Sequence, residues 1–127
     1  MIYTIARIVL GLIFLIIGLN GFFFFMPTPP ISGLAETFFT TMIASHYSVL
    51  VFSVQVIAAI MLLTDQYVPL ALVALAAVIA NVLTYHITML PRGLPLPLFT
   101  ALCWFLTAWP LRHHFALLFA RRVKLGQ

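Results

Sequence analysis

Five uncharged polar side chains interrupt the apolar segments of this chain, and they are its best candidates for a binding site. They are Asn20, Gln55, Asn81, Tyr85 and His86. Carboxamides and phenols donate and accept hydrogen bonds, and a neutral imidazole also relays protons near neutral pH. Polar groups are costly inside a bilayer and mark functional sites there. We therefore predict that these residues bind a carbonyl, a hydroxyl or a quinone head group.

The same residues also have structural interpretations, and the sequence leaves both readings open. Asn20 followed by Gly21 is typical of a helix kink or a helix end. Gln55 and Asn81 can form interhelical hydrogen bonds that only hold helices together. His86 can face the membrane interface near the end of its helix. Ligand binding and helix packing therefore compete as explanations of this polar set.

Other candidate ligands are few. Glu36 and His46 are additional contributors to the predicted site, because they fall on the same side of the membrane as His86. No metal site is predicted, since these residues form no HxxxH or HxxE motif. The single cysteine, Cys103, excludes an internal disulfide, a CxxC redox pair and a cysteine cage for a metal.

The composition is that of a membrane protein. Of the 127 residues, 65% are apolar or aromatic and 6% are charged, whereas soluble domains have roughly 45–50% and about 25%. The net charge of +4 comes from six cations scattered among apolar runs, which cannot form a phosphate-tracking surface for nucleic acid. The positive balance therefore indicates membrane topology.

Four uncharged apolar runs approach or exceed the length of a spanning helix, which takes about 20 residues. They cover residues 8–26, 47–63, 69–90 and 94–111. Short turns make the last three antiparallel neighbours. The predicted fold is all-α: a single domain, residues 1–127, that forms an antiparallel bundle of four transmembrane helices. Gly11 and Gly18 share one face of the first helix, which predicts close packing there.

The segment between the first two runs, residues 31–46, is amphipathic. Phe38 and Met42 recur at helical spacing, while Glu36 occupies another face. We predict either a helix that lies at the membrane interface or a kinked extension of the second span. The prolines at 27–30 predict a rigid, extended exit from the first helix.

The cations lie mostly on one side of this arrangement. Five fall on the side of the two termini and one in an opposite loop: Arg7, Arg112, Arg121, Arg122 and Lys124 against Arg92. The positive-inside rule predicts a protein of the inner (cytoplasmic) membrane with both termini in the cytoplasm. The polar set then lies in the outer half of the bilayer. The basic tail, residues 112–127, is predicted to lie along anionic headgroups.

Short motifs along about the first 110 residues resemble the DoxX family of membrane proteins. They are Ala6-Arg7-Ile8, Leu10-Gly11-Leu12-Ile13-Phe14, Gly18-Leu19-Asn20-Gly21-Phe22, Met26-Pro27-x-Pro29-Pro30, Tyr67-Val68-Pro69-Leu70-Ala71-Leu72, Asn81-x-x-x-x-His86 and Gly93-Leu94-Pro95-Leu96. The resemblance implies a four-helix membrane protein linked to quinone-reducing thiosulfate oxidation, to an oxidative-stress complex or to other oxidoreductases. Arg7, Asn20, Asn81 and His86 match family positions. Gln55 stands where the family commonly has a glutamate, so an acid-base role at that position is in doubt.

Two functions follow from these observations. The first is a small subunit of a redox or respiratory-type assembly that binds a quinone or another lipophile in the outer-half polar site. No cofactor of its own is expected, since the chain lacks a clear haem-ligand pair, a Rossmann glycine motif and iron–sulfur cysteines; it would be inert alone. The alternative is a purely structural or adaptor subunit. Both predict membrane lipids and a larger complex or homo-oligomer as partners.

Overall fold

The computed structural model describes residues 1–26 and 30–125, and every regular element among them is helical. The four longest helices are α1 (Ile2–Phe23), α3 (Tyr47–Leu63), α4 (Val68–Met89) and α5 (Pro95–Ala108). The shorter elements are α2 (Gly33–Ala44), α6 (Arg112–Phe115) and the 3₁₀ turns η1 (Pro91–Gly93), η2 (Trp109–Leu111) and η3 (Ala116–Phe119). The predicted all-α class is confirmed. Most of the predicted proline exit, residues 27–29, and the last two tail residues, 126–127, lie outside the described residues.

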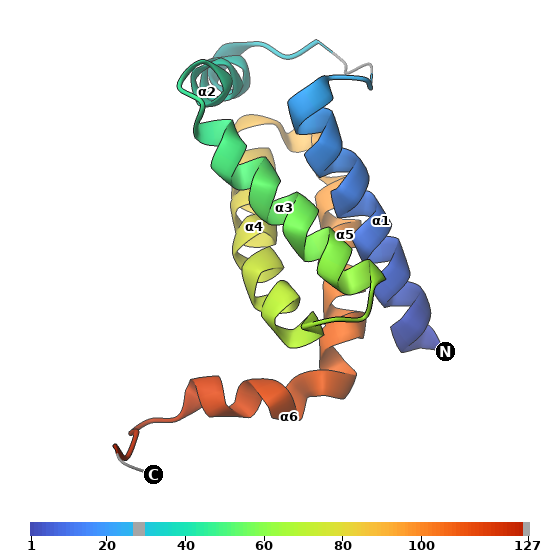
Figure 1. Ribbon diagram of the computed structural model, residues 1–127. Helices are drawn as coiled ribbons and strands as arrows, with labels where there is room; N and C mark the ends of the chain where they lie inside the picture. The colour runs from blue at the N-terminus through green and yellow to red at the C-terminus, as the bar shows by residue number, and fades with distance from the viewer. Residues whose placement is uncertain (27–29, 126–127) are drawn as a thin grey trace.

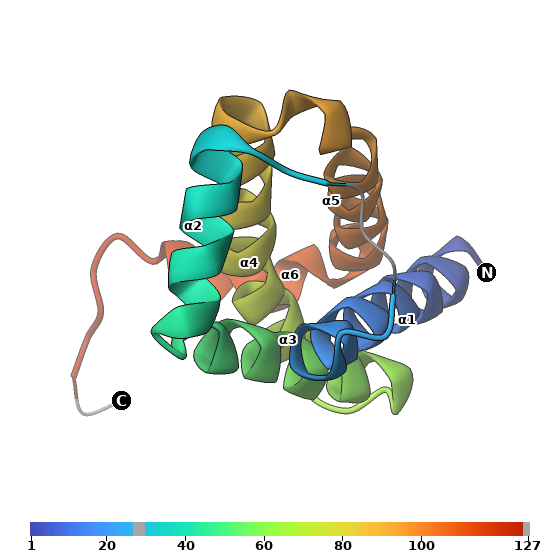
Figure 2. The ribbon, with the colours of Figure 1, turned by 90° about the horizontal axis from the view of Figure 1, so that it is seen from above.

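The four long helices lie side by side in a bundle (Figure 1 and Figure 2). α1 packs against α3 and α5, and α4 packs against the same two helices. The N-terminus and the tail lie at one end of the bundle, which we call the tail end. α2 and the turn between α4 and α5 lie at the opposite end, which we call the α2 end (Figure 1).

Two of these helices, α1 and α4, are long and apolar enough to cross a bilayer on their own. Each has 22 residues and is about 33 Å long, against a hydrocarbon core of about 30 Å. α3 passes the same test only together with α2, and these two meet at 87°. α5 has 14 residues, about 21 Å. Length and composition thus support two or three spanning helices, and the count of four stays a prediction.

Two predicted C-terminal helix ends differ by three residues from those observed, and local backbone chemistry explains both. α1 ends at Phe23 and not at residue 26, because Phe24 has a left-handed conformation with φ 50° and its N–H donates to the Asn20 carbonyl over 2.8 Å. α5 ends at Ala108 and the chain then tightens into η2. Pro110 lies in this turn, and proline has no N–H to continue an α-helix.

The centre of the bundle is filled by large apolar side chains from three helices. α1 contributes Leu10 and Phe14, α3 contributes Leu62, and α4 contributes Leu72 and Leu75. Leu10 and Phe14 are four residues apart, and Leu72 and Leu75 are three apart, which is the spacing of a helical stripe that faces a core. The apolar periodicity therefore determines which face of each helix packs into the core of the bundle.

Close packing of the first helix is confirmed, and its neighbour is α3. A Cβ atom at Gly18 would lie 2.7 Å from Val56 Cγ2, and one at Gly21 would lie 2.3 Å from Cγ of the Phe52 ring. Since real Cβ atoms do not approach so closely, these positions accept only glycine without a shift of the neighbour. The glycines allow the two backbones to come together.

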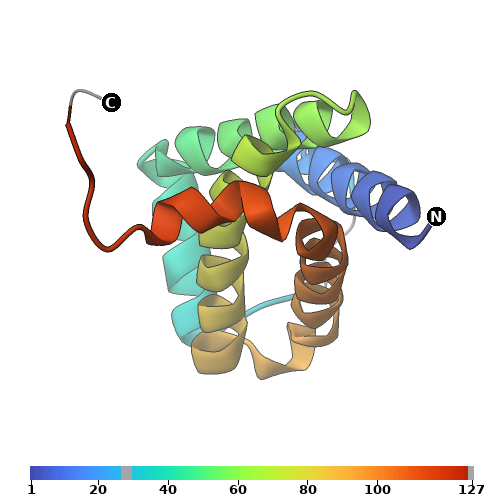
Figure 3. The same cartoon turned by 90° about the horizontal axis from the view of Figure 1, so that it is seen from below.

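Two elements lie across the ends of the bundle. At the α2 end, His46 adopts a left-handed conformation with φ 65° between α2 and α3, and the chain turns by 87° there. α2 consequently lies across the ends of α3 and α4 and does not extend α3 in line (Figure 2). At the tail end, α6 and η3 run across the ends of the bundle helices (Figure 3).

Candidate functional site

Asn20 stabilises the end of α1. Its carbonyl oxygen accepts the N–H of Phe24, and its side-chain Oδ1 accepts the N–H of Met26 over 2.8 Å. These two bonds satisfy backbone groups that a helix terminus leaves free. The structural interpretation of Asn20 therefore accounts for its type and place.

Gln55 lies in the interior, at the middle of α3. Its side chain is on the buried face with Phe52, Ala58 and Ala59, and the residue is 3% exposed. Its Oε1 has no hydrogen-bond partner among the residues that the structure describes. A buried carbonyl without a donor costs about 1–3 kcal/mol, so this atom is chemically poised to accept a hydrogen bond.

Asn81 points away from the core. It is exposed, and its Nδ2 donates to the Ala77 carbonyl of its own helix over 2.8 Å. Thr84 and Thr88 are exposed beside it and donate in the same way, to the carbonyls of Ala80 and Thr84 over 2.8 and 2.7 Å. These residues share one side of α4, and we call Ala77, Ala80, Asn81, Thr84 and Thr88 the polar face of α4.

Tyr85 and His86 lie together at the α2 end. Their rings meet edge to face with centroids 5.1 Å apart, and the Tyr85 ring also contacts Phe38 of α2 at 5.4 Å. The Tyr85 hydroxyl donates to the Ala35 carbonyl over 3.4 Å. Tyr85 therefore attaches α4 to α2.

His86 packs beneath the turn that leads to α5. Its Nδ1 is 2.8 Å from the Val82 carbonyl oxygen, so Nδ1 carries the proton and Nε2 is the acceptor in a neutral ring. A Cβ at Gly93 would lie 2.9 Å from Nε2, which shows how closely the turn covers this edge of the imidazole. His86 also continues the core-facing side of α4 after Leu75 and Ile79, at helical spacing.

The two additional candidates lie on the surface of the α2 end. Glu36 is exposed in the first turn of α2, and His46 is exposed at the break before α3. A cavity of about 340 Å³ opens nearby, between residues 30–32 and residues 89–92. The Arg92 guanidinium donates to the Pro30 carbonyl across it. None of the five predicted site residues lines this cavity.

The structure thus brings Tyr85 and His86 together and directs the other predicted residues elsewhere. Gln55 points inward, Asn81 outward, and Asn20 closes its own helix. A position in the same half of the bilayer, which is all that counting residues predicts, does not bring side chains to one point.

A buried arginine at the tail end has partners that were not predicted from the sequence. Arg7 is 9% exposed, its guanidinium donates to the Leu62 carbonyl of α3, and its Nε lies 3.8 Å from Oδ1 of Asp65. The signal was present, because Asp65 is one of only two acidic residues, and the short turn between the predicted runs 47–63 and 69–90 falls on the same side as Arg7. The cation counted for topology therefore also joins α1 to α3.

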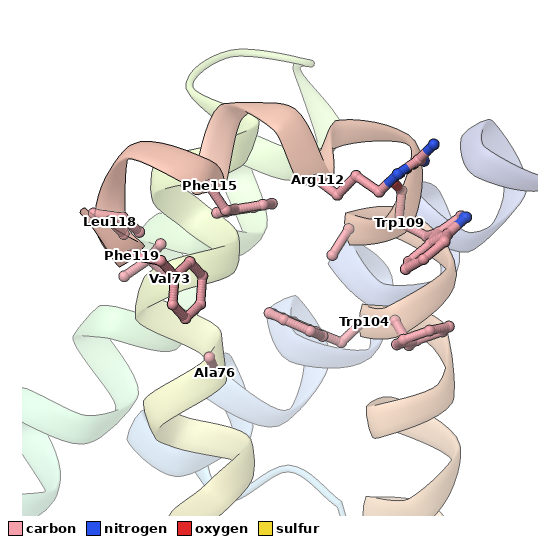
Figure 4. Close-up of a pocket in the computed structure, with 10 residues that line it drawn as sticks. Val73, Ala76, Trp104, Trp109, Arg112, Phe115, Leu118 and Phe119 are labelled. Atoms are coloured by element: carbon pink, nitrogen blue, oxygen red, sulfur yellow. Dashed lines mark hydrogen bonds between the residues drawn. The ribbon is translucent and has the colours of Figure 1, made fainter. Parts of the chain in front are cut away.

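A second unpredicted feature is a groove at the tail end, with a volume of about 350 Å³ (Figure 4). It lies between α4, α5 and the first part of the tail, and it is lined by Val73, Ala76, Trp104, Phe105, Ala108, Trp109, Arg112, Phe115, Leu118 and Phe119. The sequence predicts only that the basic tail lies along headgroups, and it does not assign the aromatic residues of the tail to a groove. Their distance in sequence from α4 concealed the groove.

Comparisons of the chain with protein-family models, with curated proteins and with solved structures find no match.

Proposed function

We propose that this protein is a small, DoxX-like membrane subunit of a larger redox-type assembly, and that the polar face of α4 contacts a transmembrane helix of a partner subunit. The observation that carries the proposal is the exposure of Asn81, Thr84 and Thr88 on a helix of membrane-spanning length. Polar side chains directed at lipid are costly. A partner helix would remove this cost.

The shape of the polar face also fits a helix. Ala77 and Ala80 precede the polar residues and leave the backbone accessible to a close neighbour. Small residues with hydrogen-bonding side chains among them are the usual composition of contacts between transmembrane helices.

We propose that all four long helices cross the inner membrane. The short helices α3 and α5 lie beside the two long ones in a single bundle, and a bilayer can thin locally around short spans. Arg7 and the cations of the tail lie at the tail end, and Arg92 lies at the α2 end. The positive-inside rule then places the tail end in the cytoplasm.

The redox character of the proposal comes from the DoxX-like motifs, and one observation favours lipophile binding as a second function. The Oε1 atom of Gln55 is buried without a donor. A quinol hydroxyl, or the hydroxyl of another lipophile, would supply one. The chain's own part would be to hold the head group, while electrons would come from the partner.

Copurification tests both functions in one experiment. The tagged full chain is expressed in its host, solubilised mildly and analysed by mass spectrometry for proteins and lipophiles. Interhelical polar contacts contribute about 0.6–2 kcal/mol, so Asn81→Leu should weaken partner recovery by about 3- to 30-fold. Thr84→Leu should do the same, whereas Thr4→Leu, an identical change at an exposed site of α1, should not.

Gln55→Leu separates the two functions. It should retain the partner protein and lose a copurifying quinone. Equal partner recovery from the wild type, Asn81→Leu and Thr84→Leu would refute docking through α4. A quinone retained by Gln55→Leu would refute the role of Gln55 in binding it.

A further inference from the structure

The groove at the tail end has walls from three parts of the chain. Val73 and Ala76 of α4 form one side, Trp104 and Phe105 of α5 form another, and Phe115 of the tail closes it (Figure 4). Its volume of about 350 Å³ falls within the range of ligand sites, about 300–1,000 Å³. The groove is therefore large enough to hold part of a ligand.

The interior of the groove offers hydrocarbon and aromatic surface. The polar atom of Trp104 is already bonded, because its Nε1–H donates to the Leu72 carbonyl of α4 over 2.7 Å. This bond fixes the indole against α4 and leaves its apolar ring to the groove. A ligand that fills this space needs no hydrogen-bonding group and must be apolar, as an acyl chain is.

The one charged side chain that lines the groove is Arg112. It is exposed, its guanidinium lies 4.6 Å from the centroid of the Trp109 ring, and its Nη1 donates to the Trp109 carbonyl over 2.9 Å. A guanidinium has five N–H donors in a planar fork, so donors remain for the oxygens of a phosphate. The aromatic ring beneath holds the cation in place.

The groove and its cation lie where a bilayer would meet water. The tail crosses the end of the bundle (Figure 3), and it continues with three exposed cations, Arg121, Arg122 and Lys124. Aromatic residues at this level are typical of membrane interfaces. An apolar groove next to a basic tail matches a molecule with a long hydrocarbon chain and a negative head.

We propose that this groove binds one anionic glycerophospholipid, with an acyl chain against Trp104 and Phe115 and the headgroup phosphate at Arg112. The inference rests on the proposed membrane placement, but it is independent of the docking of α4 and of quinone binding. The bound lipid would fill the space between the tail and the bundle and so attach α6 to α4 and α5.

Tryptophan quenching tests the site directly. The chain has two tryptophans, so Trp109→Phe leaves Trp104 as the sole probe and keeps an aromatic ring under Arg112. This variant of the full chain is reconstituted in vesicles of unlabelled phosphatidylcholine with a small fraction of brominated lipid, either phosphatidylglycerol or phosphatidylcholine. One Arg near the surface gives about a fivefold preference for anionic lipid, so Trp104 should reach half-quenching at about fivefold less brominated phosphatidylglycerol.

Two changes in this background assign the preference to the groove. Arg112→Gln should bring the two lipids to equal potency, whereas Arg92→Gln, at the opposite end of the bundle, should preserve the difference. Ala76→Leu, which fills the groove, should weaken quenching by phosphatidylglycerol, whereas Ala44→Leu at an exposed site of α2 should not. Circular dichroism and elution as a single species show that each variant is folded.

Other outcomes overturn the proposal. Equal quenching by both lipids in the Trp109→Phe variant, without a second substitution, would mean that the groove has no selectivity for anionic lipid. A preference that survives Arg112→Gln and is lost when Arg121, Arg122 and Lys124 are all replaced by Gln would mean diffuse attraction by the tail. If the protein fractionates as a soluble species, the membrane placement fails first, and that result is separate from the lipid preference.

Discussion

Arg7 is the one charged residue that is buried among the described residues, and two of its contacts differ in what they can contribute. The bond from its guanidinium to the Leu62 carbonyl is buried, whereas the side chain of Asp65 is 64% exposed. Water and salt screen an exposed carboxylate, so such ion pairs contribute about 0–1 kcal/mol. A hydrogen bond from a charged group to a buried acceptor contributes more, about 1.5–3 kcal/mol.

Substitution separates these two contacts. Arg7→Leu should lower the free energy of unfolding by about 1.5–3 kcal/mol, because the Leu62 carbonyl loses its charged donor. Asp65→Asn should lower it by less than about 1 kcal/mol. Thermal unfolding of the detergent-solubilised protein, followed by circular dichroism, measures both. A loss from Asp65→Asn as large as that from Arg7→Leu would show that the ion pair is the main contact.

The direction of individual polar side chains was only partly accessible from the sequence. Counting along each helix predicts only that Asn20, Gln55 and Asn81 lie in the outer half of the bilayer. Gln55 and Asn81 nevertheless point to opposite sides of the bundle wall, inward and outward. The stripe of Leu75 and Ile79 marks the core-facing side of α4 and could have excluded Asn81 from it. The orphaned acceptor of Gln55 could not be foreseen, because it depends on what every neighbouring helix supplies.

At the scale of elements, the contact between α1 and α3 depends on glycine residues, because a larger residue would overlap with the facing helix. Gly21 faces the ring of Phe52, whose atoms come within 2.4 Å of where a Cβ would stand. An added methyl group must displace this ring, and overpacking of a well-packed site costs about 1–3 kcal/mol. The neighbour in this case is a side chain and not a backbone, so the strain can be relieved by a second change.

A double substitution therefore tests this contact. Gly21→Ala should lower the midpoint of thermal unfolding, and Phe52→Leu should partly rescue it. The loss in the double variant should be smaller than the sum of the two single losses, because the residues share one space. Additive losses would mean that the ring and the glycine do not meet in the folded protein.

Hydrophobic patterning located the helices well, and their ends and angles less well. The second predicted run coincides with α3, and the third is shifted by one residue from α4. Uncharged runs locate helices because apolar periodicity and length are properties of the sequence itself. The end of α1, in contrast, is set by the local bonds that Asn20 makes to Phe24 and Met26, and the pair Asn20-Gly21 already indicated a helix kink or end there. The 87° turn at His46 goes together with contacts of α2 to α3 and α4, and such tertiary contacts are not visible along a single chain.

At the scale of the whole molecule, the two ends of the bundle differ in charge, and this asymmetry predicts an orientation. Cysteine labelling tests it in a Cys103→Ala background, where no native thiol remains. A membrane-impermeant maleimide should label Ser32→Cys, at the α2 end, in intact spheroplasts. It should label Gln66→Cys, in the turn between α3 and α4, only after lysis. The reverse pattern would overturn the cytoplasmic placement of the tail end and the outer placement of His86.

The hydrogen bonds on the polar face of α4 also determine which chemical groups of a neighbouring helix can pair with it. Thr84 and Thr88 each donate their single hydroxyl hydrogen to their own helix, so toward a neighbour they present only lone pairs. Asn81 retains one of its two amide hydrogens beyond the bond to Ala77. Two copies of this helix set face to face could pair through the amide of Asn81, but Thr84 and Thr88 would bring oxygen against oxygen. The face is therefore more complementary to a different sequence, one that carries hydroxyl or indole hydrogens, than to a second copy of itself.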